Sequence, residues 1–241
     1  MKSTNSGGFT LIELLVVIAI ISLLLAILMP SLRAVKQRGQ TVVCLNNLKQ
    51  IGMAANLYAN DYEDRIPRGE GSSRKLIWFM KFLPYVGHGE NVTDYKQVDI
   101  YKCKSFPKSG TGIGGIPNSR QTVCYVVNAW EFSDSSDMTG HQTNKATKLN
   151  EFRLRSSTIY LTDNEAGKWR PIIEDESSKD ISRCDIFMPS HLPTSSDETG
   201  HYSGRRIAKK RHNDGCNVLF LDWHAETMKA EDITIKNFRD K

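Results

Sequence analysis

The sequence lacks the patterns that mark several common protein classes. None of its five cysteines forms a C-x-x-C pair, which leaves a zinc ribbon or a thioredoxin-type redox motif without support. The cysteines are too few and too widely spaced for a disulfide-dense small domain; they are Cys44, Cys103, Cys124, Cys184 and Cys216. Their odd number leaves at least one thiol unpaired in an oxidising compartment unless two chains are linked.

What the sequence does contain is unevenly distributed. Of its 241 residues, 39% are hydrophobic and 24% are charged, which is typical of a globular domain rather than a disordered chain. The apolar residues are concentrated in the first thirty positions, and the rest is mixed and polar. The net charge of +5 permits an acidic partner without requiring one.

The apolar segment has the length of a membrane helix. Residues 9–29 would span roughly 31 Å as an α-helix, close to the ~30 Å hydrocarbon core of a bilayer. A secretory signal peptide would be shorter and followed by a small-residue cleavage site, which the stretch after Met29 does not offer. A simple anchor would have no use for Glu13, because a carboxylate near the membrane interior costs on the order of several kcal/mol.

A third interpretation accounts for Glu13. The stretch 8–14 (GFTLIEL) resembles the processing motif of type IV pilins and type II secretion pseudopilins. The resemblance implies that a prepilin peptidase cuts after Gly8 on the cytoplasmic side and N-methylates Phe9, while the apolar helix stays on the mature chain. In a filament, the Glu13 carboxylate could then meet the amine of a neighbouring subunit's Phe9. Pro30 also fits the family, and a proline there removes one helix hydrogen bond.

The sequence beyond Pro30 still has helical periodicity. Apolar residues recur mostly three or four apart, with polar residues between them, and predict an amphipathic helix of about thirty residues; they are Val35, Val42, Leu45, Leu48, Ile51, Ala55, Tyr58 and Tyr62. The helix should end between Asp61 and Pro67. We expect the apolar stripe to be the core of a head domain, with a groove for a partner as the alternative.

Two further stretches resemble one branch of pilin-like proteins, abundant in Planctomycetes and Lentisphaerae. The first is 44–52 (CLNNLKQIG), and the second is 211–224 (RHNDGCNVLFLDWH). In that branch a histidine is followed by nine residues and then Asp-Gly. His212 and Asp222 meet this spacing, but Trp223 replaces the glycine, which puts a tight turn with positive φ in doubt.

These patterns predict an α+β protein, with the long helix packed against a small antiparallel sheet and long loops. We divide the chain into a leader (1–8), a membrane and assembly helix (9–30), an amphipathic helix (31–65) and a head (66–241). Within the head we predict a helix at 77–86 and strands at 99–103, 122–128, 158–163 and 217–222, followed by a returning segment at 223–228. Polar stretches at 108–119, 133–145, 174–185 and 193–204 should be loops.

Several residues could form a site in the head. His212, Asp222 and His224, with Asp163 if the strands pair, could bind a divalent metal, form an acid–base pair or fix a turn. The segments 163–165 and 134–137 could supply oxygen ligands to a calcium cofactor, although neither has the spacing of a calcium loop. The cysteines allow one or two disulfides after export, with the pairing left open.

The stretch 205–211 holds five positive charges in seven residues. It could be a solvated loop or a non-specific contact for DNA phosphates, but no nucleic-acid fold motif accompanies it.

The leading functional expectation is a structural subunit rather than an enzyme. It would assemble into a type II secretion pseudopilus or a type IV pilus-like filament, after insertion in the inner membrane by a single span with its N-terminus cytoplasmic and its head periplasmic. The implied partners are the prepilin peptidase and methyltransferase, other subunits and an inner-membrane assembly platform. The alternatives are a minor pilin whose head binds DNA, polysaccharide or a secreted substrate, and a membrane-tethered hydrolase that uses His212 and Asp222.

Overall fold

The computed structural model describes residues 10–69, 77–86, 94–134, 136–143, 145–167, 170, 172–173, 184–196 and 204–239. Gly8 and Phe9 therefore lie outside the described residues. The chain divides into two compact units, Met1–Gly39 and Gln40–Lys241, which we take separately. The helix α1 (Leu11–Asp61) runs from the first unit into the second, and Pro30 lies inside it without ending it.

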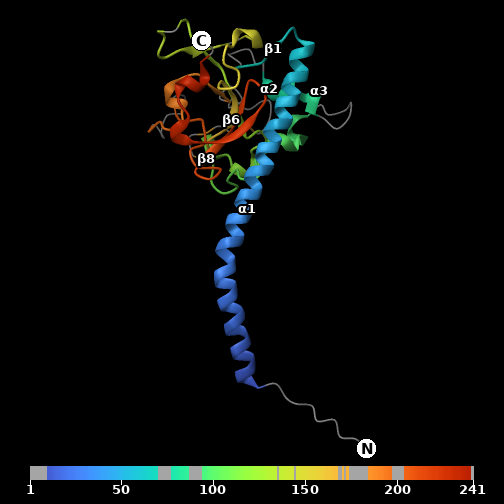
Figure 1. The fold of residues 1–241 in the computed structure, drawn as a ribbon, viewed down its shortest axis with the longest axis vertical. Helices are drawn as coiled ribbons and strands as arrows, with labels where there is room; N and C mark the ends of the chain where they lie inside the picture. The colour runs from blue at the N-terminus through green and yellow to red at the C-terminus, as the bar shows by residue number, and fades with distance from the viewer. Residues whose placement is uncertain are drawn as a thin grey trace, which may run out of the picture. The chain divides into compact units, whose positions relative to one another are not determined.

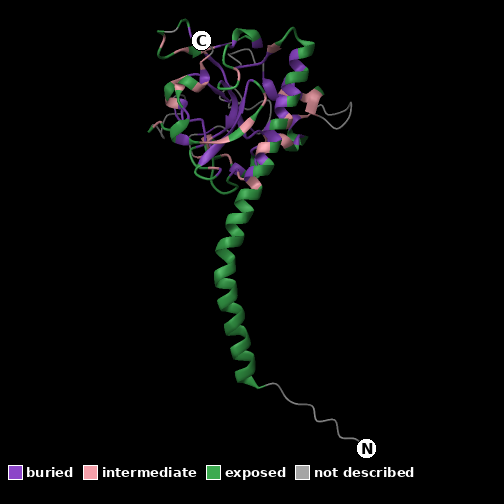
Figure 2. Ribbon diagram, in the orientation of Figure 1, coloured by how far each residue is buried: buried purple, intermediate pink, exposed green. Residues whose placement is uncertain are grey.

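In the first unit, every described residue from Thr10 to Gly39 is exposed, as the green part of α1 shows in Figure 2. By length and composition α1 could cross a membrane, and no other helix within the described ranges meets that test. The helix begins with a local cap. Glu13 Oε2 accepts hydrogen bonds from the backbone N–H and the hydroxyl of Thr10, at 2.8 and 2.7 Å.

In the second unit, α1 presents a buried face along residues 41–59. This face contains Leu48, Ile51, Ala55 and Tyr58 from the predicted stripe, together with Thr41, Cys44, Asn47, Gly52, Ala54 and Ala59. The prediction was wrong for Val35, Val42 and Tyr62, which are 63%, 64% and 50% exposed. The face begins with small or polar residues, which hydropathy alone does not mark as buried. The helix ends at Asp61, as predicted.

A five-stranded sheet forms the centre of the head, in the order β7-β2-β6-β8-β9 (Figure 1). Its strands are β2 (Tyr125–Asn128), β6 (Ile159–Asp163), β7 (Asp185–Ile186), β8 (Gly215–Phe220) and β9 (Ala225–Lys229). All neighbours are antiparallel except β2 and β7, which makes the sheet mixed. The predicted strands at 122–128, 158–163 and 217–222 and the returning segment are confirmed within a few residues.

The predicted strand at 99–103 was wrong, because Asp99–Tyr101 is a short 3-10 helix, η3. Tyr95, Val98 and Tyr101 are buried at a spacing of three, which fits one face of a 3-10 helix rather than the two-residue period of a strand. The predicted helix at 77–86 is present as α2 (Trp78–Lys81) and α3 (Leu83–Val86).

The smaller elements surround the main sheet. The strand β1 (Arg65–Ile66) pairs with β5 (Thr147–Lys148), and β3 (Trp130–Glu131) pairs with β4 (His141–Gln142), which lies in a stretch predicted as loop. The other 3-10 helices are η2 (Tyr95–Gln97), η4 (Ile113–Gly115), η5 (Asn118–Arg120), η6 (Leu149–Glu151), η8 (Pro189–His191), η9 (Ala230–Asp232) and η10 (Ile235–Phe238).

The two faces of the sheet belong to different clusters of buried residues. Tyr125 and Val127 of β2 share a cluster with Leu48 and Tyr58 of α1, whereas Val126 between them shares one with Trp130. This alternation is what the two-residue period of a strand dictates. One face of the sheet therefore covers the second half of α1, as expected for an α+β head.

Candidate functional site

The two sequence stretches at 44–52 and 211–224 contact each other in the folded head. At one end, the ligand atoms of Cys44 and His212 lie within 4.8 Å of each other, and just before the first stretch Thr41 Oγ1 lies 3.1 Å from His212 Nδ1. At the other, a Cβ atom on Gly52 would lie 3.0 Å from Leu219 Cδ1 and 3.3 Å from Trp223 Cβ. Glycine at this position of α1 thus lets the β8–β9 hairpin pack closely against the helix.

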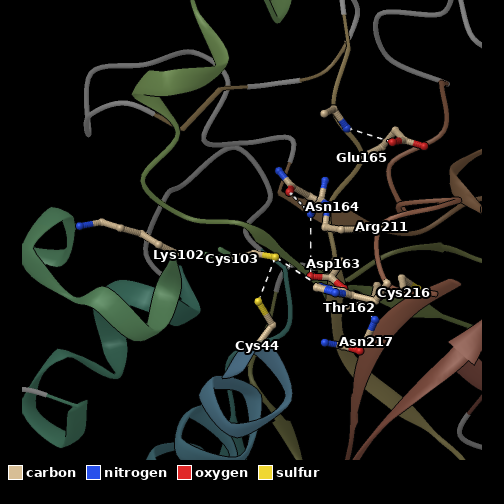
Figure 3. A network of polar contacts seen from close by, with 12 residues as sticks. Cys44, Lys102, Cys103, Thr162, Asp163, Asn164, Glu165, Arg211, Cys216 and Asn217 are labelled. Carbon is tan, nitrogen blue, oxygen red and sulfur yellow. Dashed lines mark hydrogen bonds and ion pairs between the residues drawn. The ribbon is translucent and has the colours of Figure 1, made fainter. Parts of the chain in front are cut away.

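Four buried side chains gather where α1, β6 and the turn before β8 meet, and we call them the Cys–His–Asp cluster: Cys44, Cys103, Asp163 and His212. Figure 3 shows Cys44, Cys103 and Asp163 directed toward one centre. The two sulfur atoms lie 3.2 Å apart. His212 Nε2 lies 3.3 Å from Cys103 Sγ and 3.4 Å from Asp163 Oδ2.

The cluster perturbs its own acid–base equilibria. A hydrogen bond from the Cys103 thiol, opposed by burial and assisted by His212, lowers the pKa of Cys44 to about 5. The same hydrogen bond and burial raise the pKa of Cys103 far above its ordinary value. Burial lowers the pKa of His212, but its contacts with Asp163 and Cys44 outweigh burial and raise it to about 9.

Asp163 lies at the end of β6, and the described residues donate a hydrogen bond to only one of its two carboxylate oxygens. Its Oδ2 accepts a hydrogen bond from the backbone N–H of Asn217 at 2.7 Å. Its Oδ1 is buried and accepts no hydrogen bond from the described residues. The nearest cation to Oδ1 is Arg211, whose Nη1 lies 3.8 Å away and whose guanidinium covers the Phe106 ring.

The structure does not bring His212 and Asp222 together, as the metal-site and acid–base alternatives for this pair would require. His212 precedes β8 and Asp222 follows it, so a six-residue strand that spans roughly 20 Å separates them. Asp222 is exposed and contacts His224 instead, with its Oδ1 2.5 Å from Nδ1. The expected proximity of Asp163 to His212 is confirmed, because β6 and β8 are neighbours. The structure therefore does not assemble the acid–base pair that a hydrolase at His212 and Asp222 would need.

The turn at Trp223 keeps the backbone that a glycine would favour. Trp223 has φ +72°, and its backbone N–H donates to the Phe220 carbonyl at 3.0 Å. A residue with positive φ after such a turn is a common three- or four-residue hairpin connection. The packing of the Trp223 side chain offsets part of the cost of this positive φ. Its ring lies edge-on to Tyr160 with centroids 5.9 Å apart, and its Nε1–H donates to Asn56 Oδ1 at 3.1 Å.

Comparisons with known proteins agree with the N-terminal motif and the head. Residues 3–29 match the family described as prokaryotic N-terminal methylation motif. Residues 41–102 match a family described as protein of unknown function (DUF1559). These matches cover parts of the chain, and their descriptions agree with its resemblance to pilin-like proteins.

One curated relative is the type IV wide pilus major component PilA4 of Thermus thermophilus. It is 44% identical to this chain over 57 residues, which are 24% of this chain and 44% of the relative. The matched region thus spans less than half of that relative. No solved structure matches the chain.

The basic stretch 205–211 is mostly buried, contrary to the expected solvated loop. Arg205 Nε lies 2.8 Å from Glu165 Oε2, and Arg206 Nη1 lies 2.5 Å from Asp185 Oδ1. Together with Arg211, these arginines are part of the head's interior. Lys209 and Lys210 are the basic residues of the stretch that are exposed. A DNA contact here would have two cations rather than five.

The two candidate calcium segments do not converge on a common point. Asp163 faces His212, whereas Glu165 points away to Arg205, as Figure 3 shows for the two carboxylates. Asp134 and Asp137 accept hydrogen bonds from the backbone of their own loop. Calcium needs six to eight oxygen ligands around one centre, and neither segment supplies that arrangement among the described residues.

The five cysteines are all buried, all described, and form no disulfide. The sequence analysis left their pairing open and did not connect Cys44 and Cys103 with His212. The sequence did contain one indication of the cluster, because Cys44 lies at the start of the stretch 44–52 and His212 lies at the start of the stretch 211–224. The fold decides that these two starting points meet.

Proposed function

We propose that this chain is a structural subunit of a type IV pilus-like filament, made as a precursor. A prepilin peptidase would cut after Gly8 and methylate the amine of Phe9. Residues 9–30 would hold the chain in the inner membrane with the head in the periplasm, until an assembly platform adds it to the filament. The curated relative named as a wide pilus component supports a pilus over a type II secretion pseudopilus.

The observation that carries this proposal is the exposed apolar surface of the first unit, directly after the methylation motif. Large apolar side chains from Leu11 to Met29 are between 45% and 80% exposed. Such a surface needs lipid before assembly and neighbouring helices afterwards. Because lipid removes most of the hydrophobic force between helices, close packing and charge pairing must select the neighbours.

Glu13 would supply the charge pairing. Thr10 holds its carboxylate at the start of α1, one turn from the amine that cleavage before Phe9 would release. In a filament interior, that carboxylate and the amine of a neighbour would neutralise each other, whereas either charge alone would be costly.

The first test is mass analysis of the N-terminus of the protein from its native membrane. We expect a mature chain that begins with N-methylated Phe9. A chain that begins at Met1, or one cut beyond Pro30, would contradict the proposal.

The second test replaces Glu13 with glutamine, with Glu226→Gln as the matched control on the exposed strand β9. We expect Glu13→Gln to be cut and methylated normally but to yield at least tenfold fewer filaments, an order of magnitude that corresponds to about 1.4 kcal/mol of lost pairing. The control should assemble like the wild type. Normal filament yield from Glu13→Gln would refute the charge-pairing role.

A further inference from the structure

We propose that the Cys–His–Asp cluster is a zinc-binding site, with Cys44, Cys103 and His212 as ligands and Asp163 as the fourth. The ligand atoms of the first three lie within 4.8 Å of one another, and all three residues are buried. They come from chain positions 59 and 109 residues apart, so no local turn or capping motif explains their meeting. Two thiolates, one imidazole and one carboxylate are ligands that Zn²⁺ accepts in proteins.

The distances are close to those of a tetrahedral site. With Zn–S of about 2.3 Å and Zn–N of about 2.0 Å, ligand atoms stand roughly 3.3–3.8 Å apart. The two sulfurs are 3.2 Å apart, Cys103 Sγ is 3.3 Å from His212 Nε2, and Nε2 is 3.4 Å from Asp163 Oδ2. For these three pairs of atoms, a cation at the centre requires shifts of a few tenths of an ångström. Asp163 lies outside the group whose ligand atoms are all within 4.8 Å of one another, so its carboxylate must move closer to the sulfurs to become the fourth ligand.

The surroundings orient the ligands. His212 Nδ1 lies 3.1 Å from Thr41 Oγ1. When Nδ1–H donates to that hydroxyl, Nε2 directs its lone pair toward the sulfurs and the carboxylate. Such an outer hydrogen bond to a ligating histidine is usual in zinc sites. The backbone N–H of Asn217 fixes Asp163 Oδ2 in the same way.

The charges also balance. Two thiolates and the Asp163 carboxylate carry three negative charges, which Arg211 and a divalent cation together neutralise. A monovalent cation would leave one buried negative charge. This favours Zn²⁺ over a monovalent thiophilic ion such as Cu⁺.

A disulfide between Cys44 and Cys103 is the competing use of the same sulfurs. It would account for the short distance between them, but it gives no role to His212 Nε2, which lies 3.3 Å from Cys103 Sγ and 3.4 Å from Asp163 Oδ2. The zinc site uses the thiols and the histidine together. It would join α1, the segment after η3 and the turn before β8 into one rigid unit of the head.

The test uses the full-length chain, purified in detergent under a thiol reductant, stripped with a chelator and then titrated with Zn²⁺ or Co²⁺. We expect one equivalent of metal per chain, and a thiolate-to-cobalt charge-transfer band when Co²⁺ is bound. Cys44→Ser and Cys103→Ser should each reduce the affinity by much more than tenfold, and Thr41→Val by about 10- to 100-fold with the band retained. Cys184→Ala, a buried cysteine outside the cluster, is the control and should bind like the wild type.

Two results would overturn the proposal. One is a reduced wild-type chain that binds no metal, or binds it with the affinity of the serine variants. The other is peptide mapping of alkylated protein from the native membrane that finds Cys44 joined to Cys103. The absence of metal binding and the disulfide are both measured on the wild type, so poor folding of a variant cannot obscure these two outcomes.

Discussion

Trp223 has φ +72°, a conformation that costs residues other than glycine about 1–2 kcal/mol. Because of this cost, Trp223→Ala should be less stable than Trp223→Gly, which is the reverse of the usual order. Both variants lose the same contacts, namely the edge-on ring of Tyr160 and the hydrogen bond to Asn56. Only the alanine variant keeps the backbone strain.

The magnitudes follow from these contacts. The aromatic pair contributes about 0.5–1.5 kcal/mol and the hydrogen bond about 0.5–1.5 kcal/mol. Trp223→Ala should therefore lower the free energy of unfolding by about 1–3 kcal/mol. Trp223→Gly regains about 1 kcal/mol of strain and should lose only about 0–2 kcal/mol. In an ordinary strand or helix the order is reversed, and glycine is less stable than alanine by about 0.5–1 kcal/mol.

The assay is urea unfolding of the full chain in detergent, followed by the fluorescence of Trp78 and Trp130, which are buried in the head. Trp223→Phe is a useful control, because it keeps the strain and most of the ring contact. An alanine variant as stable as the glycine variant, or more stable, would refute the positive-φ turn at this residue.

Two further changes test the packing of the head. Gly52→Ala would stabilise an ordinary helix by up to about 1 kcal/mol. Here it should lower the melting temperature, because its Cβ would lie 3.0 Å from Leu219 Cδ1 and 3.3 Å from Trp223 Cβ. The loss should shrink in a Trp223→Gly background, which removes the second contact, and an additive double mutant would contradict that contact. Arg206→Met should cost about 3–5 kcal/mol by leaving Asp185 buried without its cation. Burial already raises the pKa of Asp185, so the folded state of this variant binds the proton more tightly than the unfolded state. The free energy of unfolding of Arg206→Met should therefore be highest at low pH and fall as the pH rises through that raised pKa. A loss of stability that does not depend on pH would contradict a buried carboxylate without its cation.

The long N-terminal helix and the central strands were predictable because they depend on local patterns. The apolar run from Phe9 to Met29 has 21 residues, which is enough to predict a helix of membrane-spanning length. The β-branched and aromatic residues at 122–128 and 158–163 predict strands. The local pattern gave a wrong strand at 99–103, where the buried residues are spaced three apart and the chain forms a 3-10 helix. Local patterns also failed at the basic stretch, since a row of arginines does not show that acidic partners from distant segments will cover it.

The Cys–His–Asp cluster shows what only the tertiary structure decided. By itself the sequence determined that Cys44 lies on a helix, that Asp163 ends a strand and that His212 precedes another. It could not determine that β6 and β8 are neighbours in a register that brings Asp163 to His212, or that Cys103 reaches the same point. Those positions depend on contacts between residues about 50 to 110 apart in the chain, which are fixed by how the sheet packs on α1 rather than by any local preference.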